Sequence, residues 1–154
     1  MDKRIAAVFV VTLTASALTP FAGAQDTRKS SNAVMITVSE IKWADVPGFP
    51  GVQMAVLEGN PDKGAHRSML KFAGGFAAPS HHHSSDHSGT VVSGTLVLTV
   101  DGKATKRPAG SYFSFKNRKP HLTRCETGAD CVLSMATLGK WDVVPEKSKT
   151  DAKK

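Results

Sequence analysis

The sequence predicts an all-β protein with the architecture of an antiparallel jelly-roll barrel. Short apolar runs recur every eight to twelve residues, and clusters of glycine, proline and polar residues separate them. No window shows a sustained helical period, and few windows lack Gly or Pro for long. Many short strands at even spacing are typical of a closed antiparallel barrel or jelly roll, and they argue against alternating strands and helices.

The first predicted strands are defined by alternation and by the breaks between them. Residues 34–38 alternate apolar and polar side chains, as a half-buried strand does. The next apolar run, 52–57, lies between two turn-forming segments, 47–51 and 59–62, which contain Gly and Pro. A further alternating run, 66–72, ends just before a pair of glycines. We therefore expect three strands before residue 73.

The remaining strands are expected around a histidine-rich segment and one hairpin. Residues 80–83 are extended and lead into a polar corner. Gly94 divides two β-rich runs, and Asp101-Gly102 is a typical hairpin-turn dipeptide. The further strand-like runs are 90–93, 95–100, 111–115, 121–125, 132–138 and 141–144.

The chain of 154 residues is long enough for one ordinary domain, which we expect to span residues 33–145. Residues 1–24 have the charged start, apolar stretch and small-residue site (Ala22-Gly23-Ala24) of a cleaved signal peptide. This interpretation predicts a periplasmic or secreted protein. The apolar stretch is shorter than the roughly 20 residues of a membrane-spanning helix, so we expect no transmembrane segment in the mature chain. Residues 25–32 are expected to be a linker, and 146–154 a disordered basic tail.

The basic residues are dispersed, although the formal net charge is +7 at pH 7. Their densest cluster outside the tail is Lys116, Arg118 and Lys119, which has no regularly interleaved aromatic residues. A solvated basic surface explains this pattern, and we expect no nucleic-acid partner.

The chain contains two cysteines, Cys125 and Cys131. In an oxidising compartment such a pair can bridge the two ends of a hairpin loop. Two free thiols are the alternative. The spacing is too long for the two to form a zinc knuckle by themselves.

The histidines are the strongest candidates for chemistry, because four of the six lie between residues 81 and 87. On a strand, His81 and His83 project to one face and His82 to the other, so the first two can share one ion. His87 follows across the polar corner, where a turning chain can bring it back. Neutral imidazole is a ligand for Zn, Cu, Ni, Fe and Co. A histidine-rich surface loop that binds metal loosely is the alternative, and His66 is expected to be an ordinary surface or core histidine.

The histidine spacing resembles the first motif of the cupin family: Gly, five residues, His-x-His, three or four residues, Glu, six residues, Gly. Gly75 is followed by five residues, then His81 and His83, three residues, His87, six residues and Gly94. Every interval fits. The one departure is His87, which stands where the family usually has Glu.

The second cupin motif, Gly, five residues, Pro-x-Gly, two residues, His, three residues, Asn, is matched more weakly. Gly110 and His121 keep the Gly-to-His interval, whereas Lys116, Arg118 and Cys125 replace the Pro, the Gly and the Asn.

A second register of that motif begins at Gly102. It keeps Pro108, Gly110 and Asn117 but places Phe113 at the ligand position. The first register supplies a ligand and the second does not, so we prefer the first.

The resemblance implies a double-stranded β-helix with one divalent transition metal (Zn, Fe, Ni or Cu) inside one mouth of the barrel. It maps His81, His83, His87 and His121 onto the four family ligands, position by position. With His in place of Glu, the site should hold Mn less well than a site containing a carboxylate. Asp86 is expected either to orient a ligand from outside the coordination sphere or to be an ordinary corner aspartate.

The resemblance also implies a small-molecule ligand, and two classes of function follow. The first is a metal-dependent enzyme, either a dioxygenase-like cupin or a Lewis-acid cyclase or isomerase. The second is a non-catalytic module that binds or senses a small ligand or a metal. Lys116, Arg118 and Lys119 would rim the pocket and attract an anionic substrate, or belong to a solvated loop. Exposed strand edges make a homodimer an expectation. A third interpretation abandons the cupin for a metal-handling β-sandwich, in which His121 has no part in metal affinity.

Overall fold

The computed structural model describes residues 33–147. The expected signal peptide (1–24) and linker (25–32) lie outside the described residues, as does the expected tail (146–154) after its first two positions. Of the described residues, 35–147 belong to one compact unit. In the part of the chain that the structure describes, no helix is long and apolar enough to cross a membrane.

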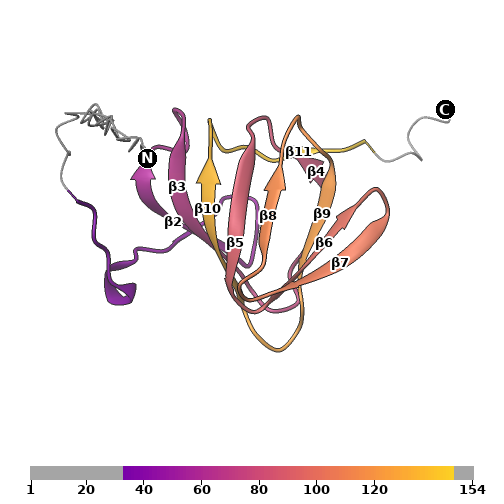
Figure 1. Ribbon diagram of the computed structural model, residues 1–154, viewed down its shortest axis with the longest axis horizontal. Coiled ribbons are helices and arrows are strands. Elements are labelled where there is room, and N and C mark those ends of the chain that lie inside the picture. The colour runs from indigo at the N-terminus through magenta and orange to yellow at the C-terminus, as the bar shows by residue number, and fades with distance from the viewer. Residues whose placement is uncertain (1–32, 148–154) are drawn as a thin grey trace, which may run out of the picture. The chain divides into compact units, whose positions relative to one another are not determined.

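Two antiparallel sheets form the barrel, which confirms the predicted all-β jelly-roll fold (Figure 1). The six-stranded sheet has the order β1 (Ala44–Asp45), β2 (Val52–Gly59), β3 (His66–Phe72), β10 (Cys131–Thr137), β5 (His87–Ser93), β8 (Tyr112–Phe115). The five-stranded sheet has the order β11 (Val144–Pro145), β4 (Ala77–His82), β9 (His121–Cys125), β6 (Thr95–Val100), β7 (Lys103–Pro108). Strands from distant parts of the chain therefore lie side by side, as β10 does between β3 and β5.

The strand expected over residues 34–38 is not formed, so that prediction is wrong. This segment is exposed, with Met35 and Val38 each 88% accessible, and it leads into a short 3-10 helix, η1 (Val38–Glu40). The Glu40 carboxylate accepts hydrogen bonds from the backbone amide and the hydroxyl of Thr37, each at 2.8 Å. Among the described residues, no strand lies beside this segment to provide the backbone hydrogen bonds that a strand needs. The local capping interactions satisfy polar groups of the segment instead.

β7 is a strand that was not predicted, because its residues show no apolar alternation. The strand forms by pairing with β6 across the predicted Asp101-Gly102 turn, with Val100 opposite Lys103. Asp101 and Gly102 have φ angles of 51° and 78°. Positive values at both central positions are what a type I′ hairpin turn requires, and its twist matches that of the flanking strands.

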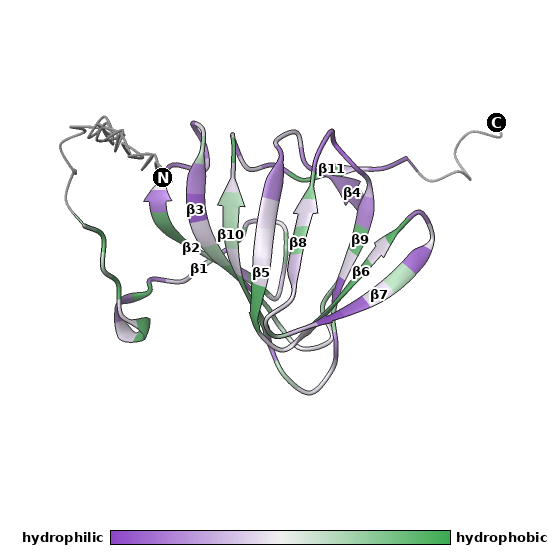
Figure 2. Ribbon diagram, viewed as in Figure 1, coloured by the Kyte–Doolittle hydropathy of each residue, from purple (hydrophilic) through white to green (hydrophobic). Residues whose placement is uncertain are grey.

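The inner face of the six-stranded sheet changes from apolar to polar toward one end of the barrel. Deep in the barrel, Leu133 lies in register between Leu70 and Val91, and all three are buried. At the end of the same strands, Thr137 lies in register between two buried histidines. Figure 2 shows hydrophobic and hydrophilic bands along these strands. The buried apolar core consists of Val52, Leu70, Phe72, Val91, Leu96, Leu98, Phe115, Cys125, Cys131, Leu133 and Met135.

The opposite end of the strands is joined by a disulfide. Cys125, the last residue of β9, is bonded to Cys131, the first residue of β10, with Cα atoms 5.8 Å apart. Both side chains are completely buried. The bridge closes the loop between the two sheets at the end remote from the histidines.

The packing of the inner face can be tested at Gly89, which lies between the disulfide and the histidine end of the barrel. A Cβ atom added at Gly89 would lie 2.5 Å from Sδ of Met135 and 2.7 Å from Cζ of Phe113. We expect Gly89→Ala to lower the free energy of unfolding by about 1–3 kcal/mol, because the core must rearrange to accept the methyl group. Chemical denaturation measures this change.

Gly64→Ala is the matched control, because a Cβ atom there meets nothing within 4 Å. It should leave stability unchanged or raise it slightly. Equal stability of the two variants would contradict the described packing around Gly89.

Candidate metal centre

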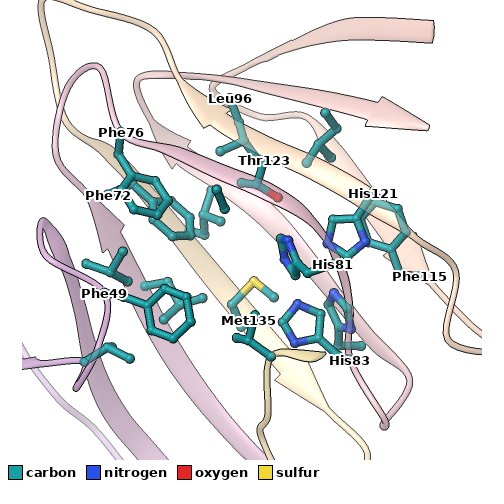
Figure 3. Close-up of a pocket in the computed structure, with 18 of the residues that line it drawn as sticks. Phe49, Phe72, Phe76, His81, His83, Leu96, Phe115, His121, Thr123 and Met135 are labelled. Atoms are coloured by element: carbon teal, nitrogen blue, oxygen red, sulfur yellow. The ribbon is translucent and has the colours of Figure 1, made fainter. Parts of the chain in front are cut away.

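Three histidines meet at the polar end of the barrel. His81 on β4 and His121 on β9 are directly paired across neighbouring strands, so their side chains point to the same face. His83 lies two residues after His81 and projects to that face as well. One ring nitrogen from each residue can be chosen so that all three atoms lie within 4.8 Å of one another. Figure 3 shows the three rings converging beside the apolar side chains of the cavity.

The tautomer of each ring is fixed by a hydrogen bond to the backbone. Nδ1 of His81 and Nδ1 of His121 each contact the carbonyl oxygen two residues earlier, at 2.7 Å and 3.0 Å. Nδ1 of His83 contacts the carbonyl oxygen of Asp142. Because a carbonyl oxygen can only accept, each Nδ1 carries the hydrogen, and Nε2 keeps a free lone pair. This is the arrangement of metal-binding histidines, whose second nitrogen is held by an outer acceptor.

Burial keeps these imidazoles neutral. The residues are only 3–6% exposed. Removal from water lowers the pKa of His83 to about 3, with a further contribution from the neighbouring His87. The same desolvation lowers the pKa of His121 to about 4 and also lowers that of His81. At neutral pH the rings are therefore unprotonated and available as ligands.

His87, the fourth predicted ligand, lies beside the trio on the other sheet. Its ring centroid is 4.5 Å from that of His83 and 6.0 Å from that of His121. Its Nδ1 donates to the Ser85 carbonyl at 3.3 Å, so its Nε2 is free as well. Burial lowers its pKa. The set with nitrogen atoms within 4.8 Å comprises only His81, His83 and His121, so His87 as a ligand stays a prediction.

Aromatic rings support the histidines from two sides. The Phe115 ring stacks on His121 with a centroid distance of 3.9 Å and an interplanar angle of 11°. The Trp141 ring lies 4.2 Å from the ring of His83. A cavity of about 60 Å³ adjoins the histidines. Its other lining is almost entirely apolar and includes Phe49, Phe72, Phe76, Leu96 and Met135 (Figure 3).

Asp86 does not contact a ligand histidine through a hydrogen bond in the described structure. Its carboxylate accepts the backbone amide of Asn117 at 3.0 Å, and its carbonyl accepts the amide of Leu138 at 2.9 Å. Asp86 thus ties together the loops around the mouth of the barrel. The hydrogen bonds that orient the three converging rings come from backbone carbonyls, and a role for Asp86 toward a bound metal stays a prediction.

The three basic residues expected at the pocket rim do not line the cavity. Lys119 forms an ion pair with Asp101 at 2.7 Å, and Arg118 donates to Nε2 of His82 at 3.1 Å. Lys116 is exposed. The short loop before β9 turns these side chains away from the apolar interior, where an unpaired charge would be costly.

Trp141 and Asp142 were not predicted from the sequence as site residues. Both lie beside His83, although they are far from it in the chain. His66 was expected to have a structural role, but its position was not anticipated. His66 is 5% exposed and its Nε2 has no hydrogen-bond partner in the described structure. The hydroxyl of Thr137, directly opposite on β10, is likewise buried and unpartnered. Sequence spacing offers no signal for such contacts across strands.

Comparison with solved structures finds the same fold in several proteins. KdgF from Halomonas sp. aligns with a TM-score of 0.56 and 23% identity, over 67% of this chain and 93% of that one. The polyketide cyclase RemF from Streptomyces resistomycificus aligns with a TM-score of 0.61 and 18% identity, over 75% and 87%. ChrR of Rhodobacter sphaeroides, in its complex with SigE, aligns with a TM-score of 0.53 and 26% identity, over 66% and 51%.

Comparison with curated protein sequences finds no significant match. The family comparison, in contrast, matches residues 31–140 to the ChrR cupin-like domain. This range covers most of the chain and contains all four of the histidines discussed above. Together with the jelly-roll fold, it removes the β-sandwich alternative. The chain belongs to the cupin superfamily, in the family of ChrR cupin-like domains.

Proposed function

We propose that this protein is an exported cupin that binds one divalent transition metal and acts as a metal-dependent enzyme on a small organic molecule. The observation that carries the proposal is the set of three buried, neutral imidazoles with nitrogen atoms within 4.8 Å of one another. The disulfide between Cys125 and Cys131 supports export, because such bonds persist in oxidising compartments.

The donor set favours borderline metals. It consists of imidazole nitrogens and contains no carboxylate. Zn, Fe(II), Ni and Cu suit such ligands, whereas Mn prefers oxygen donors. His81, His83 and His121 would hold the ion through Nε2, and His87 would join them as a fourth ligand. A bound ion with open positions supplies Lewis-acid polarisation or, for a redox metal, oxygen chemistry.

The cavity limits what can approach the histidines. The cavity beside them has a volume of about 60 Å³. The mainly apolar lining excludes bulk water and favours an uncharged part of the ligand next to the histidines. Among residues 33–147, the cavity lining contains no carboxylate that would support proton abstraction by Asp or Glu.

A non-catalytic binding or sensing module is the second candidate. The family match to the ChrR cupin-like domain favours it, since the related ChrR structure is a complex of an anti-sigma protein with SigE. Substrate-dependent turnover would support the enzyme, and tight ligand binding without turnover would support the module.

Metal content tests the proposal. Untagged protein isolated from the periplasm should contain about one equivalent of Zn, Fe, Ni or Cu by mass spectrometry. His83→Ala and His121→Ala should each lose most of the metal, because each removes one of three converging ligands.

His66→Gln is the matched control, because His66 is also buried but stands outside the cluster. It should retain the metal. Wild-type protein that holds no metal even after anaerobic reconstitution would end the metalloprotein interpretation.

The residue at position 87 should tune metal preference. We expect His87→Glu to raise the affinity for Mn(II) relative to Zn(II) by about tenfold, because a carboxylate adds charge and a hard oxygen donor. Competition titration with chelators measures both affinities. Val92→Glu adds the same charge at an exposed position of the same strand and serves as the control. Equal shifts in both variants would argue against His87 as a ligand.

Metal affinity should become strongly pH-dependent only well below the ordinary imidazole pKa, because burial lowers the pKa of all three ligands. Protons compete with the metal for Nε2 only near or below the histidine pKa, and those of His83 and His121 are lowered to about 3 and about 4. Calorimetric titration of zinc at several pH values tests this. A loss of affinity that begins at the ordinary imidazole pKa of about 6.5 would contradict it.

A further inference from the structure

A C-terminal strap, residues 141–146, runs alongside β4, which carries His81, and contacts His83 just after that strand. The chain leaves β10 at the mouth of the barrel and returns along β4, so that Val144 pairs with His82 and Pro145 with His81 in β11 (Figure 1). The backbone amide of Glu146 donates to the Ser80 carbonyl at 3.0 Å. The match to the family ends at residue 140, so the strap lies beyond it.

Asp142 holds His83 and the residue after it. The carbonyl oxygen of Asp142 accepts the Nδ1 hydrogen of His83. Its carboxylate accepts the backbone amide of Ser84 at 2.7 Å. Of the three candidate ligands, only His83 lacks the carbonyl two residues earlier as its acceptor, and the strap supplies the acceptor instead.

Glu146 holds the outer face of the same strand. Its carboxylate accepts from Nδ1 of His82 at 2.5 Å, and Nε2 of His82 accepts from Arg118 at 3.1 Å. Arg118 lies in the loop that leads to His121. A chain of contacts from Glu146 through His82 to Arg118 thus joins the strap, β4 and the segment before β9.

The first residue of the strap, Trp141, also packs beside the rings of His83 and His87. The indole of Trp141 packs 4.2 Å from the ring of His83 and 5.8 Å from that of His87. The backbone amide of Trp141 donates to the Pro61 carbonyl at 2.9 Å, which anchors the start of the strap to the β2–β3 loop. The strap is therefore fixed at both ends and contacts His83 between them.

We propose that the strap orients His81 and His83 for metal binding, with Asp142 and Glu146 as positioning residues. This inference rests on the proposed metal site and adds the part of the chain that sets its geometry. Three imidazole lone pairs directed at one point repel one another, so the rings need outside contacts to stay converged without metal. Outer contacts of this kind typically change metal affinity by about 10–100-fold.

The test measures zinc affinity of full-length variants by competition with a chelator. Asp142→Ala keeps the carbonyl that accepts from His83 but removes the carboxylate that holds the Ser84 amide and so fixes the strap beside His83. Asp142→Ala and Glu146→Ala should each weaken binding about tenfold, and together by up to about 100-fold. Glu146→Gln should restore affinity to within a few-fold of wild type, because its amide oxygen can still accept from His82. Cobalt absorption spectra of the variants should show an altered coordination geometry, which a general loss of stability would not produce.

Glu126→Ala is the matched control. Glu126 pairs with Lys106 at 2.7 Å and its side chain is 31% exposed, close to the 34% of Glu146. Thermal unfolding of the metal-free proteins separates lost affinity from lost fold. If the double variant does not fold, the zinc affinities of Glu146→Ala and Glu146→Gln are compared instead. The strap proposal requires Glu146→Ala to bind more weakly.

The outcomes separate the two proposals. A wild-type protein that binds no zinc or cobalt would overturn the metal site and the strap together. A wild type that binds, with Asp142→Ala and Glu146→Ala binding as tightly and with an unchanged cobalt spectrum, would overturn the strap alone.

Discussion

The convergence of three imidazoles at one end of the barrel is the constraint on which the site depends. The pairing of His81 with His121 across β4 and β9 brings two rings together, and the strand period adds His83. Three protonated rings within 4.8 Å would repel strongly, so the arrangement requires neutral histidines. Burial lowers their pKa values, and backbone carbonyls fix the tautomer that leaves each Nε2 free.

The rest of the barrel supports this arrangement through a division of polarity along its strands. Rows of apolar residues such as Leu70, Leu133 and Val91 fill the deep interior, while polar residues occupy the mouth. The disulfide closes the apolar end, and the C-terminal segment covers the polar end. A bound ligand would therefore meet the histidines on one side and a mostly aromatic and aliphatic wall on the other. That combination supports the proposed small organic ligand.

Much of this could be predicted from the sequence, where local spacing carried the information. The run 95–100 predicted a strand, because a β-rich run is defined by near neighbours. The interval that starts at Gly75 predicted His81 and His83, and the separate interval from Gly110 predicted His121. The strand Lys103–Pro108 was missed because register with β6, not apolar alternation, defines it. The contact between Asp142 and His83 spans 59 residues and uses a backbone carbonyl, which leaves no trace in side-chain patterns. Residues 34–38 show the converse, an alternating pattern without a neighbouring strand.

The most direct test of the central claim is anomalous X-ray diffraction from crystals of the metal-loaded protein, collected at the absorption edge of the bound metal. The account predicts one strong peak at about 2.0–2.1 Å from Nε2 of His81, His83 and His121. Coordination through Nδ1, or a peak elsewhere on the histidine-rich segment with these three rings left free, would contradict it.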